Sequence, residues 1–301
     1  MRTFPPLGWR QGGRTEPGVG RETLATTCYA SILGMCRLLG IAASEPTEFK
    51  IVLREAPRSL AALSREHRDG WGIAVFDACA GTWRVDRGVA CAGEDERFHR
   101  LAVGSRGELL VSHIRQKTIG DAALANTHPF ERGRWMFAHN GTVNDVAWLR
   151  AKASSQRLAE IAGETDSELL FAWMLTRLDE AGVTACPAGA STDRALGAIA
   201  RAGRERPSFG AFNFLLSDGA TTYAHRFGRS MFLLERSPDD AVMASRTSRD
   251  GTVLETPWSP RRSAVFVASE RITDEPWQSI EDGTLLRIER SPTPRWRLVA
   301  T

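Results

Sequence analysis

The order in which strand-like and helix-like segments follow one another limits the folds open to this chain. Apolar runs typical of strands come first, at residues 37–43, 71–76, 83–86, 109–114 and 134–138. Two segments with helical periodicity follow, at residues 169–180 and 192–204. Short strand-like runs then return, at residues 211–216, 222–226, 231–234, 265–268 and 285–288. Strands, then helices, then strands predict an α+β sandwich.

The segments between these runs predict one domain. Shorter helices are expected at residues 46–54, 94–103 and 144–152, and long loops at residues 116–133 and 236–262. The sequence Thr165-Asp166-Ser167-Glu168 is typical of a capping box, and Asp218-Gly219 of a hairpin turn. The sequence shows no internal repeat and no linker that would divide it.

Composition excludes several function classes. The net charge is only +3, and arginine is spread along the chain without a basic block, so nucleic acid is not expected as a partner. No apolar run approaches the roughly 20 residues of a membrane helix. The cysteines are odd in number and show no CxxC spacing, which argues against a disulfide framework and against a zinc site; they are Cys28, Cys36, Cys79, Cys91 and Cys186. We expect a protein of the reducing cytoplasm that binds no metal.

Residues 1–34 differ from the rest of the chain. They are rich in Gly, Pro and Arg, show no periodicity, and lack the apolar core of roughly 7–15 residues that a signal peptide needs. We expect a disordered leader, a cleaved propeptide, or sequence upstream of a true start at Met35.

The pair Met35-Cys36 indicates a candidate catalytic nucleophile. If Cys36 became the first residue, it would carry a nucleophilic thiol and, on the same residue, a free α-amine able to take the thiol's proton. The alternative is that Cys36 is a small buried apolar residue of a strand.

Four polar clusters lie where apolar segments end, as active-site residues often do. They are His113-Ile114-Arg115, Asn126-Thr127-His128-Pro129-Phe130, His139-Asn140-Gly141 and Glu164-Thr165-Asp166-Ser167-Glu168. Each cluster alone also fits an ordinary strand end, turn or helix cap.

Taken together and in this order, the motifs resemble the class II glutamine amidotransferases, which are N-terminal nucleophile hydrolases. The chain is similar to the small stand-alone branch that includes uncharacterised amidotransferases and the γ-glutamyl hydrolase of ergothioneine biosynthesis. The supporting stretches are MCRLLG, RDGWGIAVF, SHIRQ, NTHPF, FAHNG, GETDSE, FNFLLSDG and VFVASERITDEPW, between Met35 and Trp277. The resemblance implies a four-layer αββα sandwich and makes residues 36–301 a type 2 glutamine amidotransferase domain.

The resemblance also implies roles for individual residues. Cys36 would attack the γ-carbonyl of glutamine or of a γ-glutamyl amide. The Asn140 amide and the Gly141 N–H would then stabilise the oxyanion.

On the same basis, Arg115 would grip the α-carboxylate of the substrate and Asp166 would pair with its α-ammonium. Thr118 and His128 would line the pocket, while His113 and His139 would either support the residues that contact the substrate or serve as packing residues. The reaction is acyl transfer to water, so no cofactor is expected.

The sequence departs from the family after Arg115. Synthase-linked relatives continue with Trp-Ala-Thr-His, whereas this chain continues with Gln116-Lys117-Thr118-Ile119. Those relatives also carry a synthase domain, so a separate synthase subunit is the one protein partner that the resemblance leaves open.

Two other function classes compete with this interpretation. One is a silent γ-glutamyl-binding or scaffold protein in which Cys36 stays blocked. The other is a papain-like cysteine hydrolase, which would leave the Asn-Gly and Asp clusters unexplained.

Overall fold

The computed structural model describes residues 36–183, 188–238, 245–247, 253–255 and 262–301. They belong to one compact unit, Leu33–Thr301. The expectations for residues 1–34 concern a part of the chain outside the described residues, as do Cys28 and Cys186.

Among the described residues, the first sheet has seven strands in the order β13-β9-β12-β1-β4-β2-β3, and its neighbours are antiparallel. Its strands are β1 (Arg37–Glu48), β2 (Trp71–Asp77), β3 (Thr82–Gly88), β4 (Arg106–Ile114), β9 (Phe232–Arg236), β12 (Ala264–Ala268) and β13 (Gln278–Ser279). The central strand of this sheet is β1, and it begins directly after Cys36.

The second sheet is also antiparallel, and its described strands follow the order β15-β14-β8-β7-β6-β5. They are β5 (Phe130–Arg132), β6 (Trp135–Val143), β7 (Gly210–Ser217), β8 (Thr221–His225), β14 (Leu285–Glu289) and β15 (Arg295–Val299). A separate pair is formed by β10 (Ser245–Thr247) and β11 (Val253–Glu255).

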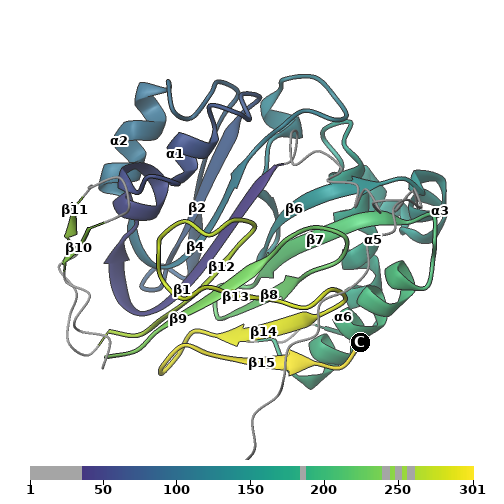
Figure 1. Cartoon of the computed structure of the whole chain (residues 1–301). Coiled ribbons are helices and arrows are strands. Elements are labelled where there is room, and N and C mark those ends of the chain that lie inside the picture. Colours follow the sequence, from purple (N-terminus) through teal and green to yellow (C-terminus); the bar gives the residue numbers. More distant parts are fainter. Residues whose placement is uncertain (1–35, 184–187, 239–244, 248–252, 256–261) are drawn as a thin grey trace, which may run out of the picture. The chain divides into compact units, whose positions relative to one another are not determined.

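Helices cover the outer faces of both sheets (Figure 1). On the first sheet lie the π-helical turn η1 (Ile51–Glu55), α1 (Leu60–Leu63) and α2 (Glu96–Gly104). The second sheet is covered by four helices that lie between β6 and β7 in the chain: α3 (Val146–Lys152), α4 (Ser155–Ala159), α5 (Asp166–Glu180) and α6 (Ala190–Arg204). This arrangement confirms the expected αββα sandwich.

The alternation of side chains along β1 shows how the layers form. Leu39 and Ile41 pack in the core beneath α1 and α2, whereas Leu38 and Ala42 pack between the two sheets. Each buried leucine-sized side chain contributes about 1.5–3 kcal/mol of burial free energy before entropy is counted. Strands that are apolar on both faces therefore sit in the two inner layers.

Two local expectations are wrong. Residues 46–54 were expected to be helical, but β1 continues to Glu48, and helical structure starts only at Ile51. Thr47 and Glu48 pair with Gly107 and Arg106 after a shift in register, so pairing with β4 overrides the helical signal of Pro46.

The expected loops are partly structured as well. Residues 116–133 contain the 3-10 turn η2 (Leu124–Asn126) and strand β5, and residues 236–262 contain β10 and β11. These segments are too short to show a clear hydrophobic period.

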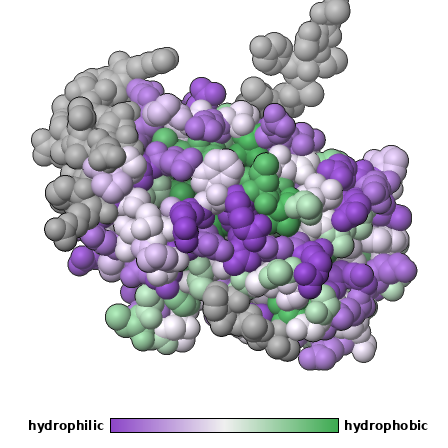
Figure 2. All heavy atoms as spheres, turned by 90° about the horizontal axis from the view of Figure 1, so that it is seen from below, coloured by the Kyte–Doolittle hydropathy of each residue, from purple (hydrophilic) through white to green (hydrophobic). Residues whose placement is uncertain are grey.

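The surface in Figure 2 shows one face of the molecule, where hydrophilic residues surround a smaller hydrophobic area. In the described part of the chain, no helix combines the length and the apolar character needed to cross a bilayer.

Candidate active site

The thiol of Cys36 is held by the backbone of Gln116. Because Arg37 pairs with Ile114, the residues after β4 lie beside the start of β1. The Gln116 N–H donates to Cys36 Sγ at 3.2 Å, and Sγ donates to the Gln116 carbonyl at 3.4 Å. The thiol thus has a fixed position at one end of the first sheet.

Opposite charges act on this thiol. Burial raises the pKa of Cys36, and the Gln116 hydrogen bond and the nearby Arg115 guanidinium oppose that shift. The Asp166 carboxylate raises the pKa further. Arg115 and Asp166, which come from different elements, therefore both lie within electrostatic range of Cys36.

The loop that follows β4 cradles the Arg115 side chain. Its guanidinium donates to the carbonyls of Asp121 at 3.0 Å, Ile119 at 3.0 Å and Gly120 at 3.2 Å, and Arg115 is only 3% exposed. These partners are neutral, so in the described structure they leave the positive charge available for an anion. Thr118 is exposed on the same loop.

Asp166 is the first residue of α5 and is buried. Its Oδ2 accepts the Val143 N–H at 2.6 Å, which ties the start of α5 to the end of β6. The Thr165 side chain caps the helix by accepting the Glu168 N–H at 3.3 Å. Asp166 therefore has a structural contact as well as a place near the thiol.

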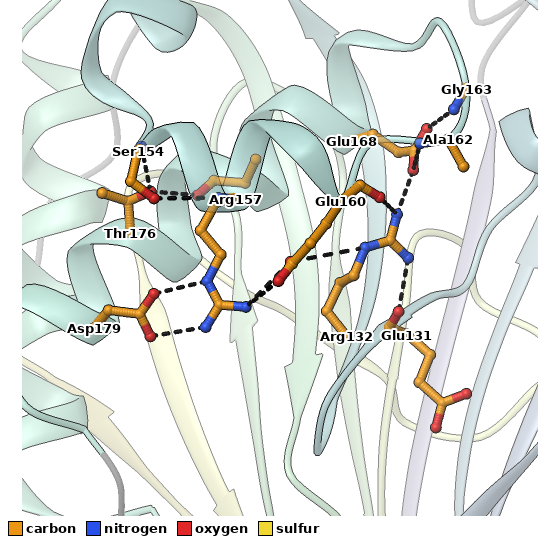
Figure 3. Close-up of polar contacts among 11 residues, drawn as sticks. Glu131, Arg132, Ser154, Arg157, Glu160, Ala162, Gly163, Glu168, Thr176 and Asp179 are labelled. Carbon is orange, nitrogen blue, oxygen red and sulfur yellow. Dashed lines mark hydrogen bonds and ion pairs between the residues drawn. The ribbon is translucent and has the colours of Figure 1, made fainter.

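The predicted capping box is only half formed. Instead of returning to the cap, the Glu168 carboxylate accepts the N–H groups of Ala162 at 3.2 Å and Gly163 at 2.5 Å. It also pairs with Arg132 of β5 at 2.7 Å (Figure 3). The first turn of α5 is thereby anchored to the turn that precedes it.

Asn140 and Gly141 lie on β6, across the sandwich from β4. A hydrogen bond of 3.1 Å joins His113 Nε2 to the His139 carbonyl and so connects the two sheets at this point. Asn140 is 3% exposed, and in the described part of the chain its side-chain amide makes no hydrogen bond.

Gly141 could not be replaced by a larger residue without strain. Its φ is +153°, and a Cβ built there would lie 2.0 Å from the Ala211 carbonyl oxygen. β6 and β7 therefore approach closely where the backbone is expected to face the substrate.

The histidines form a cluster behind these strands. The His128 ring packs against His113, with centroids 4.3 Å apart, and against Phe130, 4.4 Å away. Burial lowers the pKa of His113 to about 3 and holds the pKa values of His128 and His139 below their ordinary range. Lowered pKa values keep the three rings neutral at pH 7.

Several contacts of the site were not predicted from the sequence. Gln116 is a departure from the family pattern, yet its backbone holds the thiol. The Gln116 side chain contacts the buried His67, and the Lys117 N–H donates to Asp69 at 2.7 Å. Asn126 belongs to a predicted polar cluster, but its bonds to the Asp121 carbonyl and the Glu164 N–H were not predicted. The only sequence signal for these contacts was that the residues adjoin recognised motifs.

No group of three or more His, Cys, Asp or Glu side chains in the described ranges is arranged to hold a metal ion.

Comparison with known proteins gives consistent matches. The sequence profile of the family described as glutamine amidotransferases class-II matches residues 35–296. YafJ of Escherichia coli, named as a candidate glutamine amidotransferase, is 29% identical over 262 residues, which cover 83% of this chain and 95% of YafJ. The γ-glutamyl-hercynylcysteine sulfoxide hydrolase of Mycobacterium tuberculosis is 28% identical over 253 residues, covering 79% of this chain and 95% of that protein.

A solved structure is also similar. The crystal structure of a predicted glutamine amidotransferase from Pseudomonas aeruginosa PA01 aligns with a TM-score of 0.58 at 26% identity. The alignment covers 88% of this chain and all of the other chain.

Proposed function

Because the chain belongs to the class II glutamine amidotransferases, we propose that it hydrolyses glutamine or a γ-glutamyl amide through a glutamyl thioester on Cys36. The observation that carries this proposal is that Arg115 and Asp166 act on the Cys36 thiol with opposite charges. A glutamyl head carries a carboxylate and an ammonium on its α-carbon, which is the complementary pair.

The reaction would proceed in two acyl transfers. Cys36 Sγ attacks the γ-carbonyl carbon, its proton passes to the α-amine of Cys36, and a tetrahedral oxyanion forms. The C–N bond then breaks, the leaving amine takes the proton, and the thioester remains. Water attacks the thioester, glutamate leaves, and the thiol is restored.

The oxyanion would be stabilised by the Asn140 amide and the Gly141 N–H. The uncommitted Asn140 amide and the close approach of the backbone at Gly141 support this role. Thr118, exposed on the loop after Arg115, and His128, packed against His113 of β4, would line the pocket.

The identity of the leaving amine separates two uses of this chemistry. One is to trim a γ-glutamyl conjugate, as the name of the M. tuberculosis relative states for that protein. The other is to pass ammonia to a separate synthase subunit. The departure at Gln116-Lys117 from the synthase-linked pattern favours trimming. The unpaired Cys36, Cys79 and Cys91 support a cytoplasmic location.

The proposed base requires Cys36 to carry a free α-amine, so we also propose that residues 1–35 are absent from the active enzyme. The experiment combines the intact mass of protein purified from its native host with an assay of amine and glutamate release from a panel of γ-glutamyl amides.

Glutamate release by a chain that begins at Cys36 would support the proposal. Tight binding of γ-glutamyl compounds without turnover, by a chain that keeps residues 1–35, would instead identify a silent binding protein.

A further inference from the structure

We infer that Asn126 is a positioning residue, which sets the distance between Arg115 and Asp166 by joining the two loops that carry them. The inference rests on the proposed function, because it concerns how the two ends of the glutamyl head are read together. Asn126 is 2% exposed.

On the Arg115 side, the link runs through one carbonyl group. The Asp121 carbonyl accepts from Arg115 Nη1 at 3.0 Å and from Asn126 Nδ2 at 3.0 Å. The amide of Asn126 therefore holds the same peptide group that holds the guanidinium.

On the Asp166 side, the link runs through the backbone just before α5. Asn126 Oδ1 accepts the Glu164 N–H at 2.8 Å. Glu164 is followed by the helix cap Thr165 and then by Asp166 itself. One side-chain amide thus bonds both the loop that holds Arg115 and the turn that leads to Asp166, which we call the two arms of the site. It uses its donor for the first arm and its acceptor for the second.

The crossing leaves no spare room. A Cβ at Gly163 would lie 2.3 Å from Asn126 Oδ1 and 2.7 Å from Glu168 Oε2. A Cβ at Gly120 would lie 2.8 Å from Asn126 Nδ2. Both loops therefore have a glycine next to the Asn126 amide, and a larger residue at either position would prevent the two hydrogen bonds of Asn126.

The turn before α5 has other anchors, as Figure 3 shows. Glu168 holds the N–H groups of Ala162 and Gly163, and Arg132 holds Glu168 and the Glu160 carbonyl. Arg157 extends this network by pairing with Glu160 and Asp179. Loss of Asn126 should therefore leave α5 folded and release mainly its register against the Arg115 loop.

The consequence is specific to ligands that use both arms. A ligand held at its carboxylate and its ammonium gains from a fixed spacing of the two partners, whereas a ligand held at one end does not. We test this with three amides. Glutamine has both groups, glutaric acid monoamide lacks the α-amine, and 4-aminobutanamide lacks the carboxylate.

Two variants separate the bonds of Asn126. Asn126→Ala removes both bonds, while Asn126→Asp keeps an acceptor for Glu164 but sets an oxygen against the Asp121 carbonyl. For both, kcat/KM with glutamine should fall by about tenfold to a hundredfold. The values for the two one-armed amides should change by less than about threefold, because neither uses the spacing.

The matched control is Asp218→Ala. Asp218 is a buried side chain that also anchors backbone groups, through Ala188, Ala220 and Thr221, but on another loop. It should lower the melting temperature without changing the ratio of kcat/KM between glutamine and the one-armed amides. If the Asn126 variants reduce all three amides alike, Asn126 is only structural and the inference is overturned.

A binding measurement keeps the inference separate from the proposed function. In a Cys36→Ala background, calorimetry compares glutamate with glutarate and 4-aminobutanoate, with and without Asn126→Asp. Selective loss of glutamate affinity supports the inference even if the wild-type protein turns over no amide. Equal affinities of the three ligands in the presence of Asn126 would overturn it.

Discussion

Cys36 and Gln116 exchange two hydrogen bonds, one to the sulfur from the N–H and one from the thiol to the carbonyl. This pairing fixes the position of the thiol and by itself lowers the thiol's pKa, but desolvation outweighs it and the pKa of Cys36 is raised. A half-buried thiol with a raised pKa is mostly neutral at pH 7 and reacts poorly until a substrate brings its electrophile to it.

We therefore predict that two reagents will choose different cysteines. Iodoacetamide at pH 7 should alkylate the exposed Cys79 before Cys36, and the rate at Cys36 should still be rising at pH 9 because its pKa is raised. A diazo-ketone analogue of glutamine should instead modify Cys36 alone. Peptide mass mapping of both reactions decides this, and preferred labelling of Cys79 or Cys91 by the analogue would refute the assignment of the nucleophile.

The second prediction concerns β6, the strand that carries the proposed oxyanion-stabilising residues Asn140 and Gly141. Asn140→Ala should lower kcat by roughly a hundredfold or more with little change in KM, because its contact would form only with the developing charge. Steady-state kinetics on a γ-glutamyl amide measure this. An increase in KM alone would assign Asn140 to substrate binding.

Gly141→Ala should act differently, by disturbing the strand pair. The new Cβ would overlap the Ala211 carbonyl in addition to straining the backbone, so we expect a loss of about 3 kcal/mol or more in unfolding free energy. Gly133→Ala is the matched control, since it also has positive φ but no atom within 4 Å of a new Cβ. It should cost about 1–2 kcal/mol. Equal urea midpoints for the two variants would contradict the close approach at Gly141.

The fold was largely predictable because it depends on pattern. The apolar runs around Leu39, Val111 and Phe214 predict strands whichever strands they pair with, and the helical periodicity after Asp166 predicts α5. Pro46 misled the prediction because long-range pairing with β4, which no local pattern reveals, decided the structure there.

The candidate site was predictable only at residues whose type alone indicates their chemistry. Cys36, Arg115 and Asp166 stand out as a nucleophile and two opposite charges, and the structure places them within range of one another. The contacts of Gln116 and Asn126 depend on which backbone groups lie next to them in the fold. Those partners are up to 80 residues away in sequence, so they required the folded structure.

The third prediction concerns recognition of the glutamyl head. Arg115→Lys keeps the charge but loses the planar guanidinium that donates to Ile119, Gly120 and Asp121. We therefore expect kcat/KM to decrease by a factor that corresponds to about 2–3 kcal/mol of lost transition-state stabilisation. Kinetics with glutamine measure this loss. A lysine variant with wild-type kcat/KM would remove Arg115 from substrate binding.

Asp166→Asn should impair substrates with a free α-amine far more than their N-acetyl forms, because only the former offer a cation. The Asn carboxamide oxygen can still accept the Val143 N–H, so the fold should persist. Paired assays of γ-glutamyl amides and their N-acetyl derivatives give the ratio. Equal losses for both sets would leave Asp166 as a structural anchor of α5.

The last prediction follows from His225, a buried residue of β8 outside the proposed site. Its ring packs against Phe212 and Phe214, its Nδ1 lies 3.1 Å from the Phe212 carbonyl, and burial lowers its pKa to about 4. In the unfolded chain the pKa of histidine is about 6.5. The folded value is the lower one, so its contribution to stability is complete above pH 6.5 and is lost as the pH falls toward 4.

Between pH 7.5 and pH 5 this one group should cost the folded protein on the order of 2 kcal/mol. His225→Phe removes the titration, so its unfolding free energy should depend less on pH over that range, even if the lost hydrogen bond lowers stability at both pH values. Urea titrations of the two proteins at pH 7.5, 6 and 5 measure the difference. Parallel pH dependences would show that His225 takes up protons equally in both states, because the folded protein would then accommodate the charged ring.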